Sequence, residues 1–287
     1  MIYLIISILA STLVFVLFKL LSKYKINTLQ TIIVNYFVAF TIGITSATET
    51  ITLTSIINKQ WFYGAVFLGF LFITIFNVVA LTAQKNGLSV ASVASKMSVV
   101  IPIVFGIYAY NENLSPQKLL GISLALIAVY LTSIKVKTST VKLKNVWLPV
   151  ILFIGSGIID TTLKYIETTY VSTIETHLFS AIIFAISGLI GITILSAKAI
   201  KGALKIDFRS IYSGLILGII NYYSIYMLLK ALQIDQFESS IIFTLNNVAI
   251  VMISTLVGLS FFREKLSLKN WFGIALAIVS IILVTLA

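Results

Sequence analysis

Lys96 is the one charged residue in the stretch SVASKMSVVIP, and it lies nine residues beyond Gly87. The helical rise places it roughly 13 Å into an apolar segment. At that depth an ionisable group is costly and usually faces a cavity or a partner. Ser89, Ser92 and Lys96 follow the spacing i, i+3 and i+7 and so share one helical face. We expect Lys96, with Ser92 beside it, to bind a carboxylate, phosphate or other electron-rich group of a substrate. The alternative is a lysine neutralised by an internal partner such as Asp160.

Asp160 and Lys164 are spaced i, i+4 in GSGIIDTTLKYIE, so they can pair on one helical face. Such a pair either joins helices as a structural contact or provides a proton site, because a partly buried carboxylate can take up and release a proton during a cycle. Lys164 and Lys19 stand late in their apolar segments, where a long side chain can also reach the membrane interface. All three residues belong to the expected binding site, and a proton site would make protons a partner of the protein.

Neutral polar side chains also occur inside the apolar segments. They are Thr74 and Asn77, Tyr222 and Tyr226, and the adjacent Asn246 and Asn247. Hydrogen bonds between helices explain many such residues in membrane proteins; contact with substrate is the other interpretation. Together with Lys96 and Asp160 they would line a cavity of mixed polar, aromatic and charged character. Such a cavity suits an amino acid or similar zwitterion, with the lysine for its carboxylate, the aspartate for its amine and the tyrosines for its side chain.

The composition decides which solvent surrounds these residues. Apolar residues make up 59% of the 287 positions and charged residues 10%, far from the balance of a soluble domain. The net charge is +11, but the basic residues lie in short gaps between apolar runs, so they orient a membrane protein and do not indicate nucleic-acid binding. The chain has no cysteine and one histidine, which excludes thiol catalysis, disulfides and multi-histidine metal sites. We expect no cofactor and no metal.

The apolar runs are long and continuous. About 20 residues cross a bilayer as a helix, and backbone groups in lipid must be satisfied within the segment. The expected fold class is therefore an all-α integral membrane protein with ten transmembrane helices. The expected spans are 2–21, 29–46, 61–84, 88–110, 116–134, 147–166, 174–196, 211–232, 237–261 and 268–286.

One stretch occurs twice, as ENLSPQKLLGISLA and, 152 positions later, as EKLSLKNWFGIALA. The two serines are expected to cap the helices that follow them. The two glycines, each with an alanine four residues on, let helices approach closely. We interpret the repeated stretch, and the GxxxG pair Gly214 and Gly218, as structural. The structural motif consists of Glu112, Ser115, Gly121, Glu264, Ser267 and Gly273.

Each copy of the motif stands between the fourth and fifth spans of a set of five. Because five is odd, the second set must cross the membrane in the opposite sense, which gives two inverted five-helix repeats around a central cavity. The loop charges agree. The loop after the first span carries Lys23 and Lys25, whereas its counterpart after the sixth span has no Lys or Arg. The expected organisation is a first repeat at 1–134, a basic linker at 135–146 and a second repeat at 147–287.

The ten helices, the two E-x-L-S…G motifs and the lysine late in the first span of each repeat resemble the EamA type of the drug/metabolite transporter superfamily. The resemblance covers essentially the whole chain. It implies a polytopic carrier with a cavity between its halves, lined mainly by spans 1, 3, 4, 6, 8 and 9. It implies no particular substrate, since the family handles amino acids, sugars, nucleotide-linked compounds, amines and drugs.

We therefore expect a secondary transporter that moves a small polar metabolite, an amino acid or related zwitterion first among the candidates, outward across the cytoplasmic (inner) membrane by alternating access. A lipid-headgroup flippase or a drug or amine exporter of the same fold is the alternative. An integral-membrane enzyme ranks last, because the spans hold no H-E-x-x-H, no second histidine and no acid pair at useful spacing. The expected partners are the small-molecule substrate, membrane lipids and protons, and the protein acts as a monomer or homodimer.

Both termini are expected on the same side of the membrane. Of the 20 Lys and Arg residues, 14 lie on the side opposite the N-terminus and 3 share its side. By the positive-inside rule this count puts both termini outside the cytoplasm, whereas the family resemblance implies that both are inside.

Overall fold

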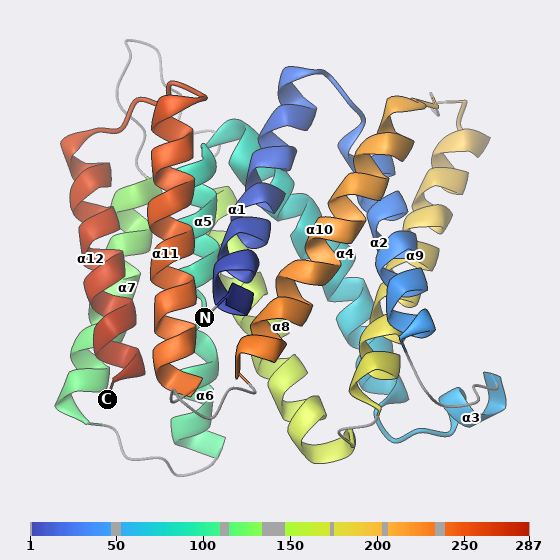
Figure 1. Cartoon of the computed structure of the whole chain (residues 1–287), viewed down its shortest axis with the longest axis horizontal. Coiled ribbons are helices and arrows are strands. Elements are labelled where there is room, and N and C mark those ends of the chain that lie inside the picture. The colour runs from blue at the N-terminus through green and yellow to red at the C-terminus, as the bar shows by residue number, and fades with distance from the viewer. Residues whose placement is uncertain are drawn as a thin grey trace. The chain divides into compact units, whose positions relative to one another are not determined.

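The computed structural model describes residues 2–46, 53–109, 115–133, 147–172, 175–202, 206–232 and 239–286. Within these ranges every regular element is a helix, as Figure 1 shows. The helices are α1 (Ile2–Lys23), α2 (Thr28–Thr45), α3 (Leu53–Ile57), α4 (Phe62–Lys85), α5 (Leu88–Met97), α6 (Val100–Ala109), α7 (Pro116–Ser133), α8 (Trp147–Tyr170), α9 (Thr176–Ile200), α10 (Arg209–Leu232), α11 (Ser239–Ser260) and α12 (Leu268–Thr285).

The expected all-α membrane fold with about ten spans is confirmed. Among the described residues, α1, α2, α4, α9 and α10 contain segments long and apolar enough to cross a membrane. Shorter apolar helical segments occupy 88–102, 116–132, 147–163, 245–260 and 268–283. The short helix α3 between the second and third spans was not expected from the sequence.

The fourth span differs from its prediction. The sequence predicts one continuous helix over 88–110, but the helix is interrupted between α5 and α6. Pro102 explains the position of the break, because it has no N–H to donate to the carbonyl of Ser98 four residues earlier and its ring conflicts with that carbonyl. The Ile101 N–H bonds to Ser98 O instead, at 2.9 Å. As a result, Lys96 lies in the last turn of a half-length helix.

The chain forms two compact units. Unit 1 consists of residues 1–20, 78–158 and 223–287, and unit 2 consists of 21–77 and 159–222. In unit 1, α7 packs along α12 and α5 along α11; in unit 2, α2 packs along α9 (Figure 1). Each of these pairs joins spans that correspond in the two expected repeats: the fifth with the tenth, the fourth with the ninth, and the second with the seventh.

Small residues allow the close approach of α7 and α12, as the repeated motif predicts. Ala125 and Ala277 are completely buried. A Cβ on Gly273 would lie 2.9 Å from the Leu131 Cβ, and the Ser280 hydroxyl donates to the Gly121 carbonyl at 2.7 Å. The packing role expected for this part of the motif is confirmed.

The two motif serines cap their helices, which is also confirmed. Ser115 Oγ accepts the Lys118 N–H at 3.1 Å. Ser267 Oγ accepts the Asn270 N–H at 3.1 Å, and the Asn270 side chain bonds back to the Ser267 N–H at 2.9 Å, completing a capping box. The Asn270 amide also donates to the Leu131 and Thr132 carbonyls, both at 3.0 Å, which ties the start of α12 to the end of α7.

In unit 2 the GxxxG pair brings α10 against α2. A Cβ added to Gly214 would lie 2.4 Å from the Val34 Cβ, and one added to Gly218 would lie 2.6 Å from the Val38 Cβ. Any larger residue at either glycine would force the two helices apart. The structural interpretation of this pair is confirmed as well.

Candidate functional site

The expected binding residues are divided between the two units. Unit 1 contains Lys19, Ser92, Lys96, Tyr226, Asn246 and Asn247, and unit 2 contains Thr74, Asn77, Asp160, Lys164 and Tyr222. The structure describes contacts inside each unit. The grouping of all eleven residues around one cavity stays a prediction.

Ser92 and Lys96 lie on α5 in unit 1. Ser92 is fully buried, and its hydroxyl donates to the Ser89 carbonyl at 3.0 Å and accepts from the Ser254 hydroxyl at 2.6 Å. It therefore helps to join α5 to α11. Lys96 is partly exposed in the last turn of α5. A cation is favourable there, because the backbone carbonyls at a helix C-terminus carry partial negative charge.

The remaining unit 1 candidates lie on α10 and α11. Asn246 is 2% exposed, and its Oδ1 lies 3.4 Å from the Ser7 hydroxyl. Asn247 is also buried. The Tyr226 ring stands edge to face against Tyr223, and the Lys230 ammonium lies 5.7 Å from the Tyr226 ring centroid, a cation–π distance.

In unit 2, two candidates are bonded to their own helix. The Thr74 hydroxyl donates to Phe70 O at 2.9 Å, and the Asn77 amide donates to Ile73 O at 2.7 Å. Both bonds reach four residues back along α4, as polar side chains in helices often do. Thr74 and Asp160 are exposed and Tyr222 is buried. The side chain of Lys164 and the whole of Glu112 lie outside the described residues.

Sequence reasoning missed the partner of Lys19. The Lys19 ammonium lies 3.4 Å from Glu264 Oε1 and also donates to the Ala83 carbonyl at 3.1 Å. The same Glu264 oxygen accepts the Leu88 N–H at 2.7 Å, and Oε2 accepts the Ser89 hydroxyl at 3.3 Å. The carboxylate thus caps the N-terminus of α5, where partial positive charge favours an anion.

The backbone at the end of α11 explains how Glu264 reaches this position. Arg263 adopts the left-handed conformation, with φ 50°, and the Glu264 N–H returns to the Gly258 carbonyl at 2.9 Å. The bond reaches six residues back, one residue further than the six-to-one bond of a Schellman turn, so it closes a wider turn at the end of α11. The turn projects the Glu264 side chain beside the last turn of its own helix. The signal in the sequence was the joint recurrence of the motif glutamate and the late-span lysine in both halves.

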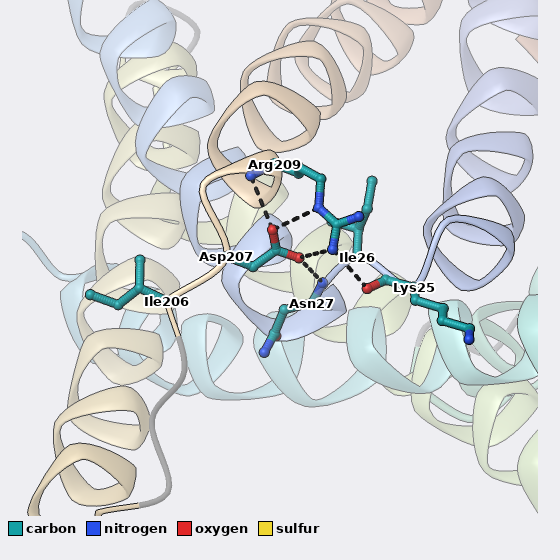
Figure 2. Close-up of a pocket in the computed structure, with 6 residues that line it drawn as sticks. All are labelled: Lys25, Ile26, Asn27, Ile206, Asp207 and Arg209. Atoms are coloured by element: carbon teal, nitrogen blue, oxygen red, sulfur yellow. Dashed lines mark hydrogen bonds and ion pairs between the residues drawn. The ribbon is translucent and has the colours of Figure 1, made fainter.

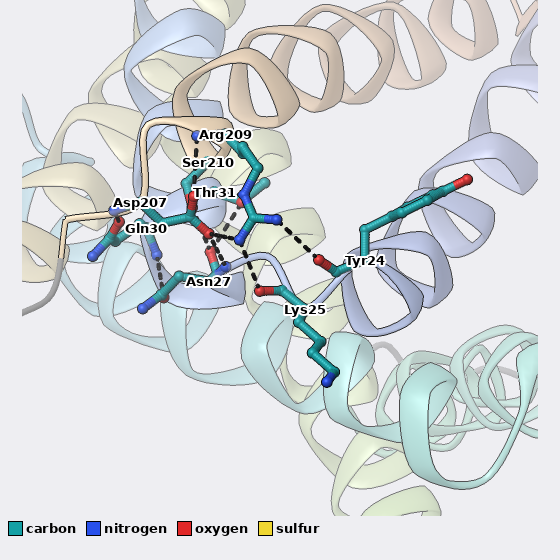
Figure 3. A network of polar contacts seen from close by, with 8 residues as sticks. All are labelled: Tyr24, Lys25, Asn27, Gln30, Thr31, Asp207, Arg209 and Ser210. Carbon is teal, nitrogen blue, oxygen red and sulfur yellow. Dashed lines mark hydrogen bonds and ion pairs between the residues drawn. The ribbon is translucent and has the colours of Figure 1, made fainter.

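Asp207 forms a second cluster, in unit 2 (Figure 3). Its carboxylate accepts the Asn27 N–H at 3.3 Å and the Arg209 N–H at 3.1 Å, so it caps the N-termini of both α2 and α10. The Arg209 guanidinium bonds to the same carboxylate through Nε at 3.0 Å and to the Tyr24 carbonyl at 3.3 Å. These hydrogen bonds, the one from the Arg209 side chain first, hold the pKa of Asp207 below its ordinary value of 3.8.

The Asp207 cluster lines an open pocket of about 420 Å³. Figure 2 shows the Arg209 guanidinium turned back onto the Asp207 carboxylate, while the Lys25 ammonium points away from it. Because the arginine and the carboxylate already satisfy each other, the pocket offers little unpaired charge to a ligand. The lining residues are Lys25, Ile26, Asn27, Ile206, Asp207 and Arg209.

The third cluster, which also lies in unit 2, centres on Glu175, immediately before α9. Its carboxylate forms an ion pair with Lys59 and accepts the Trp61 indole N–H at 3.3 Å. The Lys59 hydrogen bond is the largest influence on the pKa of Glu175 and holds it below the ordinary value of 4.5, against the opposing effect of burial. The Trp61 ring packs edge to face on Phe179 at 5.5 Å. This arrangement fixes the start of α9, and the polar groups of Lys59, Trp61 and Glu175 bond to one another.

These elements, all-helical and apolar with paired equivalent spans, can be compared with known proteins. Residues 1–134 match the EamA-like transporter family. A protein of Haemophilus influenzae described as uncharacterized is 27% identical over 295 residues, covering 97% of this chain and 95% of the relative. A crystal structure of a protein at 15% identity matches with a TM-score of 0.55 over 98% of this chain and 97% of its own, which is a likeness of fold.

The first part of the chain is thus similar to an EamA-like transporter family, and the apolar helices support a multi-pass membrane protein. In each of the three clusters, polar groups hold helix ends in place. These contacts give each unit a defined scaffold.

Proposed function

We propose that the protein is a secondary transporter that moves an amino acid or related zwitterion outward across the cytoplasmic membrane by alternating access. The observation that carries the substrate class is the position of Lys96, in the last turn of α5 and directly before the break in the fourth span. Transporters commonly bind substrates and ions at such interruptions, where helix ends present charge and backbone groups inside the membrane.

The end of α5 offers groups of both signs. Lys96 supplies a cation for a carboxylate. The backbone carbonyls at a helix C-terminus carry partial negative charge, which attracts an amine; at this end of α5, Ser95 O accepts the Ser98 hydroxyl at 2.6 Å. A zwitterion carries both complementary groups within a few bond lengths, which is why we favour it over a plain amine or a phosphorylated metabolite.

The packing of equivalent spans supports the alternating-access part of the proposal. The pairs α7 with α12, α5 with α11 and α2 with α9 each join one span from either half of the chain. In a carrier built from inverted repeats, the two access states arise when the halves exchange conformations about a central site. When the two halves exchange conformations, a contact between equivalent spans is present both before and after the exchange.

The test is a thermal-shift screen of the purified protein in detergent against amino acids, amines, drugs, sugars, nucleosides, phosphorylated metabolites and phospholipid headgroups. A ligand at 100 times its Kd should add about 2.7 kcal/mol to the stability of the folded state. The screen is repeated with Lys96→Gln and with the matched control Lys269→Gln, which removes the same charge from an exposed position on α12.

We expect stabilisation by one or more amino acids, lost in Lys96→Gln and kept in Lys269→Gln. Counterflow of the labelled hit in proteoliposomes then establishes transport. Hits confined to amines or drugs would replace the zwitterion with the exporter alternative. Stabilisation by phospholipid headgroups alone would indicate a flippase. An amino-acid hit that Lys96→Gln leaves intact would remove Lys96 from the site.

A further inference from the structure

Four helix ends meet at Glu264 in unit 1. Lys19 extends from the last part of α1, and its ammonium contacts both Glu264 and the carbonyl of Ala83 near the end of α4. The Gln84 amide returns from α4 to the Phe18 carbonyl on α1 at 3.1 Å. Glu264 itself follows α11 and caps the start of α5. Three of these helices belong to the first half of the chain and one to the second.

The carboxylate is closely fitted into this junction. The Glu264 side chain is 9% exposed and the Lys19 side chain 21%. A Cβ on Gly258 would lie 2.6 Å from Glu264 Oε2, and a Cβ on Gly87 would lie 2.8 Å from Oε1. Gly87 also has φ 111° and ψ 164°, a conformation that is essentially restricted to glycine. Both glycines thus leave room for the carboxylate.

Polar contacts of this kind can open reversibly. A buried ion pair gains little net free energy over its hydrated partners, because desolvation offsets most of the attraction. If the four helix ends separate, water can replace each protein partner of Glu264 and Lys19. If apolar side chains closed the same place, water could not replace their contacts. Opening would then cost the whole free energy gained by burying their apolar surface.

The interior of unit 1 contains two buried hydroxyls without a hydrogen-bond partner among the described residues. Thr12 Oγ1 on α1 and Thr255 Oγ1 on α11 are buried, with residue exposures of 4% and 3%, and they have no hydrogen-bond partner among the described residues. Thr12 precedes Lys19 by seven residues, which places it on the same face of α1 about 10 Å away along the axis. Buried hydroxyls without partners are rare, because each costs free energy that contact with water would recover.

We propose that Glu264 and Lys19 form a latch that holds unit 1 closed where α1, α4 and α11 end and α5 begins. The latch opens when the interior of unit 1 becomes accessible to water from the side of the membrane on which these helix ends lie. The latch joins the two halves of the chain, which must move against each other in the proposed transport cycle. Its role in transport therefore rests on the proposed function, but its opening is measurable without any substrate.

The absence of cysteine from the chain allows a clean measurement. Thr12→Cys places one thiol in the interior, on the face of α1 that carries Lys19 and about 10 Å from it along the axis, and removes no hydrogen bond made to a described residue. The rate of its reaction with a membrane-impermeant maleimide is compared in three backgrounds: the native latch, Glu264→Gln, and Glu175→Gln as a control that removes the same charge from an ion pair in unit 2. The protein is reconstituted in sealed vesicles.

We expect Glu264→Gln to raise the labelling rate roughly tenfold, equivalent to about 1.4 kcal/mol in the opening equilibrium, for reagent added on the side where α1 ends. Glu175→Gln should leave the rate within about twofold, and Glu264→Asp, which keeps the charge, should give a smaller increase than Glu264→Gln. Lys19→Gln removes the ion pair but keeps the helix cap, and it decides the question if Glu264→Gln fails to fold.

An unchanged labelling rate in a folded Glu264→Gln or Lys19→Gln protein would overturn the latch. An equal rise for reagent added on the other side of the membrane would also overturn it, because that result indicates general loosening. These outcomes are independent of the ligand screen. If Glu264→Gln speeds labelling in a protein that binds no amino acid, the proposed substrate is rejected and the latch is retained. If the protein binds an amino acid but labelling is unchanged, the latch is rejected and the substrate is retained.

Discussion

Glu264 in unit 1 and Asp207 in unit 2 are loop carboxylates with the same local task, and their surroundings differ. Each accepts backbone N–H groups at a helix N-terminus and pairs with a basic side chain. Glu264 pairs with Lys19 from a distant part of the chain, and both side chains are largely buried. Asp207 pairs with Arg209 two residues away, and the Arg209 side chain is 63% exposed.

The difference indicates what each carboxylate contributes. An exposed pair between near neighbours is screened by water and salt and adds little to stability. Asp207 therefore acts mainly as a double helix cap that shapes a turn. When one member of a buried pair is removed, the other is left as an uncompensated charge. Glu264 accordingly controls whether four helix ends stay together.

Deletion of each carboxylate tests this contrast most directly. Glu264→Ala should lower the free energy of unfolding by about 3 kcal/mol, because it leaves Lys19 without its counter-ion and the α5 N-terminus without its cap. Asp207→Ala should cost clearly less. Denaturant unfolding in detergent micelles at low and high salt measures both. The contrast fails if Asp207→Ala proves the more damaging change, or if salt weakens the Glu264 contribution as much as that of Asp207.

Two glycines with positive φ extend the contrast to the backbone. Gly87→Ala should cost about 2 kcal/mol, because its backbone conformation is strained for any other residue and the new Cβ would meet the Glu264 carboxylate. Gly202, after α9, has φ 65°, and a Cβ added there would have no atom within 4 Å. Gly202→Ala should therefore carry only the left-handed backbone cost of about 1 kcal/mol.

The same unfolding measurement gives both values, and the Thr12→Cys labelling rate supplies a second observable. Gly87→Ala should speed labelling, whereas Gly202→Ala should not. Equal costs for the two substitutions, with no effect on labelling, would indicate that the carboxylate has room to move away and that Gly87 serves the backbone alone.

The smallest expected effect is on the pH dependence of stability. Asp207 and Glu175 have folded-state pKa values below their ordinary 3.8 and 4.5. Their contribution is therefore present above those values and is lost as the pH falls through the folded-state pKa. The thermal midpoint should decline by a few degrees between about pH 5 and about pH 3, and less in Asp207→Asn and Glu175→Gln. A steeper decline in either variant would reverse the assigned direction.

The sequence predicted the ten-span architecture well, because long apolar runs leave the backbone no other solution in lipid. Rules that apply within a few residues predicted the helix caps at Ser115 and Ser267. Such rules also predicted the close helix packing at Gly273 and at the Gly214–Gly218 pair. The break in the fourth span was equally local in origin. Pro102 stands in the sequence, but the prediction of one continuous helix overlooked that a proline cannot donate to the Ser98 carbonyl four residues earlier.

The candidate site was harder to predict, because its contacts depend on which distant segments meet. Spacing along a helix placed Ser92 and Lys96 on one face, but it gave no indication that Ser92 would bond to Ser254 on α11. Lys19 and Glu264 were both identified, one as a binding residue and the other as part of a turn motif. Only the turn after α11 brings them together, and helical periodicity carries no information about a turn of that kind.

The pairing of equivalent spans also bears on how the chain assembles after it enters the membrane. The small-residue face of α7 finds its partner in α12, which is made nearly half the chain later, and α2 must likewise wait for α9. Contacts between segments so far apart in sequence form slowly. Early spans must therefore stay inserted in lipid with their packing faces unpaired, and neither unit reaches its final form until spans from the second half have been synthesised.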